Sequence, residues 1–300
     1  MGIQDRSKRI LANFSLLLTG AIWGGGFVVM KNALDTIPVN YLLAFRFLIG
    51  ALGLSFSLLN KKHKISRALV GHSAIVGLLL YASFAVQTYG LALTSAGKSA
   101  MITAVYVILV PIFGWALYKK RPAGRILFAA CLMLAGVALV SWDGANDGVN
   151  AGDMLTLLCG VLYAVEIMAV DRFGEGVDVF QFSCLQFAFA SAIAFLGAGL
   201  VEDFPRVWTA DMYGALAYCG LASTLIAMTL MNIGIKYASP DYASLFMSTE
   251  SAFGCLFGVL FLQEGMSAMM LLGCLIILAA LTISQIDFGK RKRENGIQRI

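Results

Sequence analysis

Residues 244–264 read SLFMSTESAFGCLFGVLFLQE, a stretch long and apolar enough to lie in lipid that carries an acid, Glu250, about a third of the way along. An unpaired carboxylate at that depth in a bilayer is costly, so this side chain is expected to face protein or water rather than lipid tails. The stretch therefore predicts a membrane helix whose acid is either compensated by the protein or used by it.

The composition of the whole chain also indicates a membrane protein. Of its 300 residues, 59% are hydrophobic and 13% are charged, and the mean hydropathy is +0.82. These values exclude an ordinary soluble domain. The apolar runs are about twice as long as the roughly ten residues of a transmembrane barrel strand, so helices are expected to satisfy the backbone in lipid. We predict an all-α integral membrane protein.

Ten apolar windows predict ten transmembrane helices. They cover residues 13–31, 41–59, 70–92, 99–118, 125–142, 153–170, 180–200, 212–235, 243–263 and 267–286. Lys and Arg gather in alternate connecting segments, beginning with the segment before the first window, so both termini are expected in the cytoplasm. No small-residue cleavage site follows the first window, and the pattern as a whole favours a multi-pass protein of the plasma membrane.

The windows fall into two halves of five. Residues 1–142 form the first repeat, 143–152 an acidic extracytoplasmic connector, 153–286 the second repeat and 287–300 a basic cytoplasmic tail. At an offset of 140 residues, LLTGAIWGGGF in the first half aligns with LLCGVLYAVEI in the second, which pairs Trp23 with Tyr163. A repeat with an odd number of spans makes the second copy inverted, an arrangement typical of secondary transporters. Alternating access around a central site is therefore the predicted mechanism.

Four blocks of sequence carry a family resemblance. They are WGGGFVVMK in the first window, RFLIGA in the second, QTYGLALTSAGKSAMITAVYVILVPIFGW across the third and fourth, and STESAFGCLFGVLFLQE near the end. In this order they make the chain resemble the EamA-type members of the drug/metabolite transporter superfamily over nearly its whole length. The resemblance implies a ten-helix, two-repeat fold with a central cavity, and export of amino acids or other small metabolites.

Glu250 is the first candidate for the transport site. On a helix it shares a face with Gly254 and Gly258, whose small size predicts a closely packed neighbouring helix. Its counterpart in the first half is Tyr106, so two polar groups are expected at equivalent depths. Glu250 would orient the solute, receive its amine or carry a coupling proton; the alternative is a buried acid bonded to Ser or Thr, or paired with Arg46.

Glu166 and Arg46 are candidates for coupling or gating. Glu166 lies three residues after Tyr163 and on nearly the same helix face, where a water-exposed gate, a snorkelling carboxylate and a binding role are the alternatives. The long stem of Arg46 would carry the guanidinium to the interface or to a partner helix, as a structural tie or a substrate contact. Its counterpart is Gln186, so the repeat does not require the charge.

Other polar or amphipathic side chains well inside the windows suit stacking on a solute or hydrogen-bonding it. The full set of predicted substrate-binding residues is Trp23, Tyr81, Gln87, Tyr106, Tyr163, Asn232 and Glu250. Each can equally be a packing residue with a local partner, because buried polar groups usually find one. Trp23 and Tyr163 gain weight as a pair because they occupy matching places in the two repeats.

Other function classes lack their signatures. No GxSxG, HExxH or Walker A pattern occurs, so an enzyme or an ATP-driven pump is not expected. The six cysteines form no CxxC pair, so no metal or cofactor is predicted. The basic tail indicates a membrane anchor rather than a nucleic-acid site. The expected partners are a small-molecule substrate and the lipid bilayer, with protons as a candidate coupling ion; a channel-like facilitator or a structural membrane protein are the alternatives.

Overall fold

The computed structural model describes residues 3–59, 65–119, 124–141, 149–237, 243–244, 247 and 249–285. Across these ranges the chain is helical and forms no strand. Most of the predicted connector (143–148) and the predicted basic tail (287–300) lie outside the described residues.

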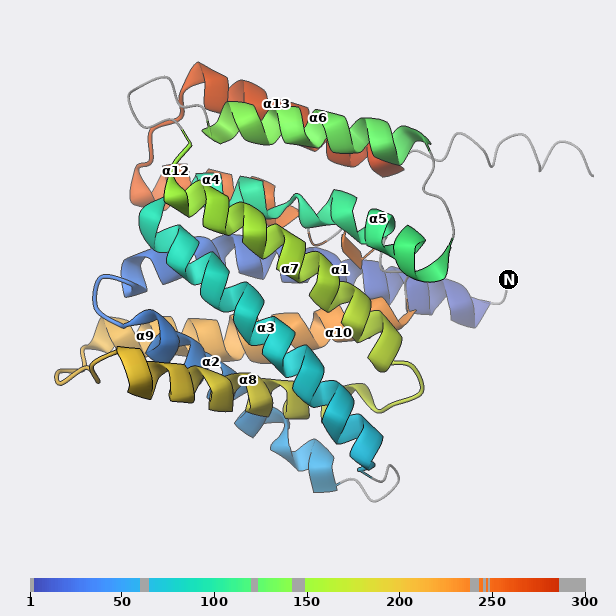
Figure 1. Ribbon diagram of the computed structural model, residues 1–300, viewed down its shortest axis with the longest axis vertical. Coiled ribbons are helices and arrows are strands. Elements are labelled where there is room, and N and C mark those ends of the chain that lie inside the picture. Colours follow the sequence, from blue (N-terminus) through green and yellow to red (C-terminus); the bar gives the residue numbers. More distant parts are fainter. Residues whose placement is uncertain are drawn as a thin grey trace, which may run out of the picture.

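The helices follow the order of the predicted windows (Figure 1). The first half contains α1 (Ile3–Ala33), α2 (Val39–Leu54), the 3-10 helix η1 (Ser55–Leu59), α3 (Arg67–Leu93), α4 (Ala96–Thr103), α5 (Tyr106–Tyr118) and α6 (Gly124–Ser141). The second half contains α7 (Ala151–Phe173), α8 (Val179–Val201), α9 (Ala210–Ala217), the π-helix η2 (Tyr218–Met228), α10 (Thr229–Tyr237), α12 (Thr249–Leu262) and α13 (Ala268–Gln285).

Seven helical segments of the described chain are long and apolar enough to cross a membrane. They are Phe14–Ala33, Val39–Leu59, Arg67–Leu93, Ala96–Leu117, Ala151–Phe173, Val179–Val201 and Ala210–Lys236, and shorter apolar helices cover Thr249–Leu262 and Ala268–Ala280. Helices satisfy their own backbone groups, which lipid cannot do. The chain is therefore a multi-pass, all-helical integral membrane protein.

Two predicted windows are interrupted rather than continuous. The window at 99–118 breaks between α4 and α5, where Val107 N bonds Ala104 O at 3.0 Å and Ile108 N bonds Val105 O at 3.1 Å, the tighter i+3 pattern. Pro111 lies one turn further on and has no N–H, and its ring crowds the carbonyl four residues earlier. The break places Tyr106 at the start of α5.

The window at 212–235 contains the π-helix η2, which sequence periodicity did not predict. Its 11 residues have wider turns than an α-helix, and the Thr224 hydroxyl donates back to Cys219 O at 2.8 Å. Wide turns of this kind are often found at functional sites. Here η2 packs against both α1 and α2.

The halves are in contact along several helix pairs. The α6–α13 pair lies at one edge of the molecule and the α2–α8 pair towards the other, with α1, α7, α12 and the α4–α5 segment between them (Figure 1). Small residues bring α1 and α12 together: a Cβ at Gly24 would overlap the Cβ of Phe253 and lie 2.9 Å from Gly254 N. A Cβ at Gly254 would likewise overlap the Cβ of Ala100 in α4, which confirms that the glycine face of α12 meets a protein neighbour.

Candidate functional site

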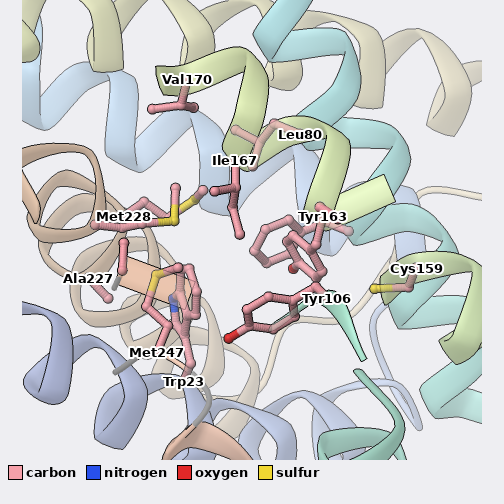
Figure 2. Packing of buried hydrophobic residues seen from close by; sticks show 14 of the residues in the cluster. Trp23, Leu80, Tyr106, Cys159, Tyr163, Ile167, Val170, Ala227, Met228 and Met247 are labelled. Atoms are coloured by element: carbon pink, nitrogen blue, oxygen red, sulfur yellow. The ribbon is translucent and has the colours of Figure 1, made fainter. Parts of the chain in front are cut away.

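Glu250 lies in the first turn of α12 and is only 3% exposed. With Trp23 of α1, Tyr106 of α5 and Tyr163 of α7, it lines a small cavity whose remaining walls are Ile167, Met231 and Met247. Figure 2 shows Tyr106 directing its hydroxyl towards Trp23 and Met247, with Tyr163 beside it. Four of the predicted binding residues are thus brought together.

A second cavity continues from the same three side chains, Trp23, Tyr163 and Glu250. Its other lining residues are Gly26, Phe27, Met30, Phe84, Gln87 and Ser223. Each cavity offers about 10 Å³, room for about one water molecule. The centre of the protein is therefore closed, and the cavities must widen before they accept a metabolite.

Three of the predicted residues already have partners in the protein. The Tyr163 hydroxyl donates to Gln87 Oε1 at 3.1 Å, and the Trp23 indole donates to the backbone oxygen of Ser223 at 3.0 Å. The ring of Tyr163 also makes edge contacts with Phe84 and Tyr106, at centroid distances of 5.4 and 6.2 Å. These contacts hold the aromatic walls in place around the cavities.

Tyr106 differs, because its hydroxyl is buried without a hydrogen-bond partner among the described residues. The carboxyl group of Glu250 lies close enough to interact with this hydroxyl electrostatically, without a hydrogen bond of good geometry. An unsatisfied buried polar group costs about 1–3 kcal/mol. The Tyr106 hydroxyl therefore presents unused binding capacity on the cavity wall, beside the carboxyl group of Glu250.

Arg46 reaches a partner segment and not the membrane interface. Its side chain is 0% exposed. Nε donates to Thr224 Oγ1 at 3.0 Å, Nη2 to Ser223 Oγ at 2.8 Å and Nη1 to Met30 Sδ at 3.3 Å. These acceptors are uncharged, so the alternative that Glu250 pairs with Arg46 is wrong for this conformation. The guanidinium instead ties α2 to η2.

Glu166 is completely buried, which contradicts the water-exposed and snorkelling alternatives in this conformation. Both of its carboxyl oxygens lack a hydrogen-bond partner within the described ranges, as do both side-chain polar atoms of Gln186. The inward face of α7 explains the burial, because Tyr163 and Ile167, on either side of Glu166, both line the central cavity. Glu166 itself does not line either central cavity.

Tyr81 and Asn232 lie apart from the central group. The Tyr81 hydroxyl donates to Asn40 Oδ1 at 2.8 Å, near the N-terminus of α2. Asn232 Nδ2 donates to Ser183 Oγ at 2.8 Å, while its Oδ1 has no partner in the described chain. Asn232 lines a separate cavity of about 530 Å³ between the α7–α8 connection and α10.

Sequence reasoning missed three residues beside the site: Met30, Phe84 and Ser223. They line the second cavity and contact Arg46. Met and Phe are ordinary in an apolar window, so nothing marks them there. The Ser-Thr pair at 223–224 was the one available signal, because two adjacent hydroxyls in an apolar run need partners.

The chain is similar to known proteins over nearly its whole length. The sequence profile of the EamA-like transporter family matches the chain twice, over residues 10–142 and 150–285. The chain belongs to this family. As an EamA-like transporter it is similar to an uncharacterized transporter of Archaeoglobus fulgidus, 28% identical over 92% of this chain and 86% of that protein.

Two further similarities bear on this EamA-like transporter. A probable amino-acid metabolite efflux pump of Escherichia coli is 25% identical over 93% of this chain and 95% of that protein. A solved crystal structure covers 96% of this chain and 99% of its own, with a TM-score of 0.71 and 19% identity. The second similarity supports the fold alone.

Proposed function

We propose that the protein is a secondary transporter of ten spans, built as two inverted repeats over 1–142 and 153–286 with both termini in the cytoplasm. Support comes from matching helix contacts. α1 packs on α12 as α7 packs on α4 and α5, and η2 packs on α1 as α3 packs on α7. The pairs α2–α8 and α6–α13 are unchanged when the halves are exchanged. Two equivalent halves suit alternating access.

One observation supports the transport site most strongly. Trp23, Tyr106, Tyr163 and Glu250 come from four helices, two in each half, and meet around one closed cavity. Polar groups buried in a membrane protein are costly and most often mark a substrate or ion pathway. A solute bound in this cavity contacts both halves, so its binding depends on their relative position.

The cavity at Asn232 supports access from the cytoplasmic side. It is much larger than the central cavities, about 530 Å³, and its lining includes Arg172 and Lys236. Basic residues mark cytoplasmic ends. Ile167 and Met231 line the central cavity and lie within one helical turn of residues that line this vestibule. Apolar side chains alone would then close the inner route.

Hydrogen bonds close the opposite end. Glu264 accepts the backbone N–H groups of Ala96 and Gly97 at 2.6 and 2.9 Å, at the N-terminus of α4. Glu202 accepts the backbone N–H of Asn40 at 2.9 Å, at the N-terminus of α2. Charge-assisted bonds of this type are stronger than neutral ones. The structure fits an occluded state in which charge-assisted bonds hold the end opposite the Asn232 cavity.

The proposed solute is an amino acid or a related small metabolite, moved out across the plasma membrane. The name of the Escherichia coli relative supports this class and direction. In this mechanism Trp23, Tyr163 and neighbouring polar groups hold the solute, and rocking of the repeats opens the cavity outward. Glu250 orients the solute, receives its amine or carries a proton that drives the cycle.

The test is solute counterflow in proteoliposomes loaded with pooled amino acids and metabolites, with and without a pH gradient. Wild type is compared with Glu250→Gln and with Asp203→Asn, which alters an exposed acid outside the cavities. Saturable exchange in wild type and in Asp203→Asn, lost or insensitive to the gradient in Glu250→Gln, supports the proposal. Flux without saturation or trans-stimulation indicates a channel, and absence of any flux indicates a structural protein.

A further inference from the structure

Arg46 carries a positive charge that the described chain does not neutralise. Arg46 heads the largest fully buried side chains, and its three hydrogen-bond acceptors are two hydroxyls and a thioether. The guanidinium carbon lies 4.4 Å from the ring centroid of Phe84, a cation–π contact that recovers part of the lost hydration. A buried charge normally has a counter-charge, because removal from water is costly.

The weakest of these contacts faces the central site. Sulfur is a weak acceptor, so the bond from Nη1 to Met30 Sδ satisfies a charged donor poorly. Met30 is flexible as well as apolar, and its side chain is easily displaced. Carboxylates, by contrast, match the fork of N–H groups that a guanidinium presents.

The guanidinium lies one layer of side chains behind the second cavity. Met30, Phe84 and Ser223 contact Arg46 and also line that cavity, which Glu250 lines as well. Between the two charged residues runs a row of rings, from Phe84 to Tyr163 to Tyr106. A buried base and a buried acid thus flank one aromatic cavity from opposite sides of this row.

We propose that Arg46 binds the carboxylate of a zwitterionic solute whose ammonium group is received by Glu250. This inference rests on the proposed transport function and names the charge pattern of its substrate. The carboxylate takes the place of the Met30 sulfur at Nη1 when the cavity widens, while Ser223 and Thr224 keep Nη2 and Nε in position. The solute supplies the counter-charge that the described chain lacks. The charge of Arg46, between α2 and η2, is therefore neutralised in the occupied state and not in the empty one.

The experiment compares an amino acid with its carboxamide, which keeps the ammonium group and loses the carboxylate. Counterflow of both is measured for wild type, Arg46→Gln, Arg46→Lys and, as a control at an exposed arginine outside the central cavities, Arg206→Gln, each checked for folding by thermal unfolding in detergent. Wild type is expected to prefer the acid at least about tenfold in kcat/KM, the worth of a charge-assisted contact. Arg46→Gln is expected to lose this preference because its flux of the acid falls while its flux of the carboxamide does not, and Arg206→Gln is expected to keep the preference.

The outcomes separate the inference from the transport function. The inference is overturned if wild type transports the carboxamide and the acid equally well. It is also overturned if the Arg46 variants lower the counterflow of both compounds equally, because Arg46 is then a structural tie. Arg46→Lys keeps the charge without the fork, so a reduced preference in this variant supports the inference where Arg46→Gln does not fold. Exchange of no compound by wild type overturns the transport function itself.

Discussion

Trp23 donates its indole N–H to the backbone oxygen of Ser223 at 3.0 Å, and the hydroxyl of the same serine accepts a bond from Arg46 at 2.8 Å. Ser223 therefore connects the aromatic wall of the central cavity to the buried guanidinium. Because it belongs to the π-helix η2, a movement of η2 displaces both groups together.

The Trp23–Ser223 bond predicts the effect of Trp23→Phe. The substitution keeps a ring but leaves the Ser223 carbonyl without this donor, so the free energy of unfolding in detergent is expected to fall by about 1–3 kcal/mol. Solute flux is expected to fall with it. The control is Trp115→Phe, because Trp115 is 40% exposed and lines neither central cavity. Equal effects of the two substitutions would contradict a special role for Trp23.

The contact between α1 and α12 predicts that Gly24→Ala destabilises the protein. Its new Cβ would overlap the Cβ of Phe253 and press on the backbone of Gly254, at a cost of about 1–3 kcal/mol. Gly199→Ala is the matched control, because a Cβ at Gly199 meets nothing within 4 Å and helix propensity then favours alanine by about 0.5–1 kcal/mol. Thermal unfolding should move in opposite directions for the two variants.

Sequence patterns predicted the all-helical membrane fold and the polar residues around Glu250. Polar side chains inside a long apolar run can be recognised from the sequence alone. The pairing of Trp23 with Tyr163 followed from the repeat in the same way. The π-helix was not predictable, since its hydrophobic pattern does not differ from that of an α-helix. The partner of Arg46 depends on which helix faces α2, and this depends on tertiary packing.

Burial of Glu166 could not be predicted for a related reason. Its position towards the end of a window allowed either a snorkelling or an inward rotamer, and the packing of α7 decides between them. Tyr81 and Asn232 look equivalent to Gln87 in sequence because all three are polar residues inside apolar runs. Only the fold places Tyr81 beside Asn40, Asn232 at the larger cavity and Gln87 at the central one.

Glu166→Met is expected to stabilise the protein. The acid is fully buried and its carboxyl oxygens find no partner in the ranges that the structure describes, so an apolar side chain of similar length should raise the free energy of unfolding by about 1 kcal/mol or more. Flux is expected to persist, because Glu166 does not line the central cavities. Stability is measured by thermal unfolding and flux by counterflow, and lost flux in a well-folded variant would place Glu166 in the coupling mechanism.

Glu264→Gln is expected to loosen the closure at the N-terminus of α4 without affecting the rest of the fold. The carboxylate accepts the N–H groups of Ala96 and Gly97 where the positive end of the α4 dipole lies, and a neutral amide accepts such bonds more weakly. Hydrogen exchange of these two amides should accelerate by about tenfold, corresponding to about 1.4 kcal/mol. Glu202→Gln is the matched variant, since it should instead accelerate the amides of Asn40 and Tyr41. If both substitutions accelerate all four amides alike, this end of the protein opens as a single unit; if neither changes them, these carboxylates do not hold it closed.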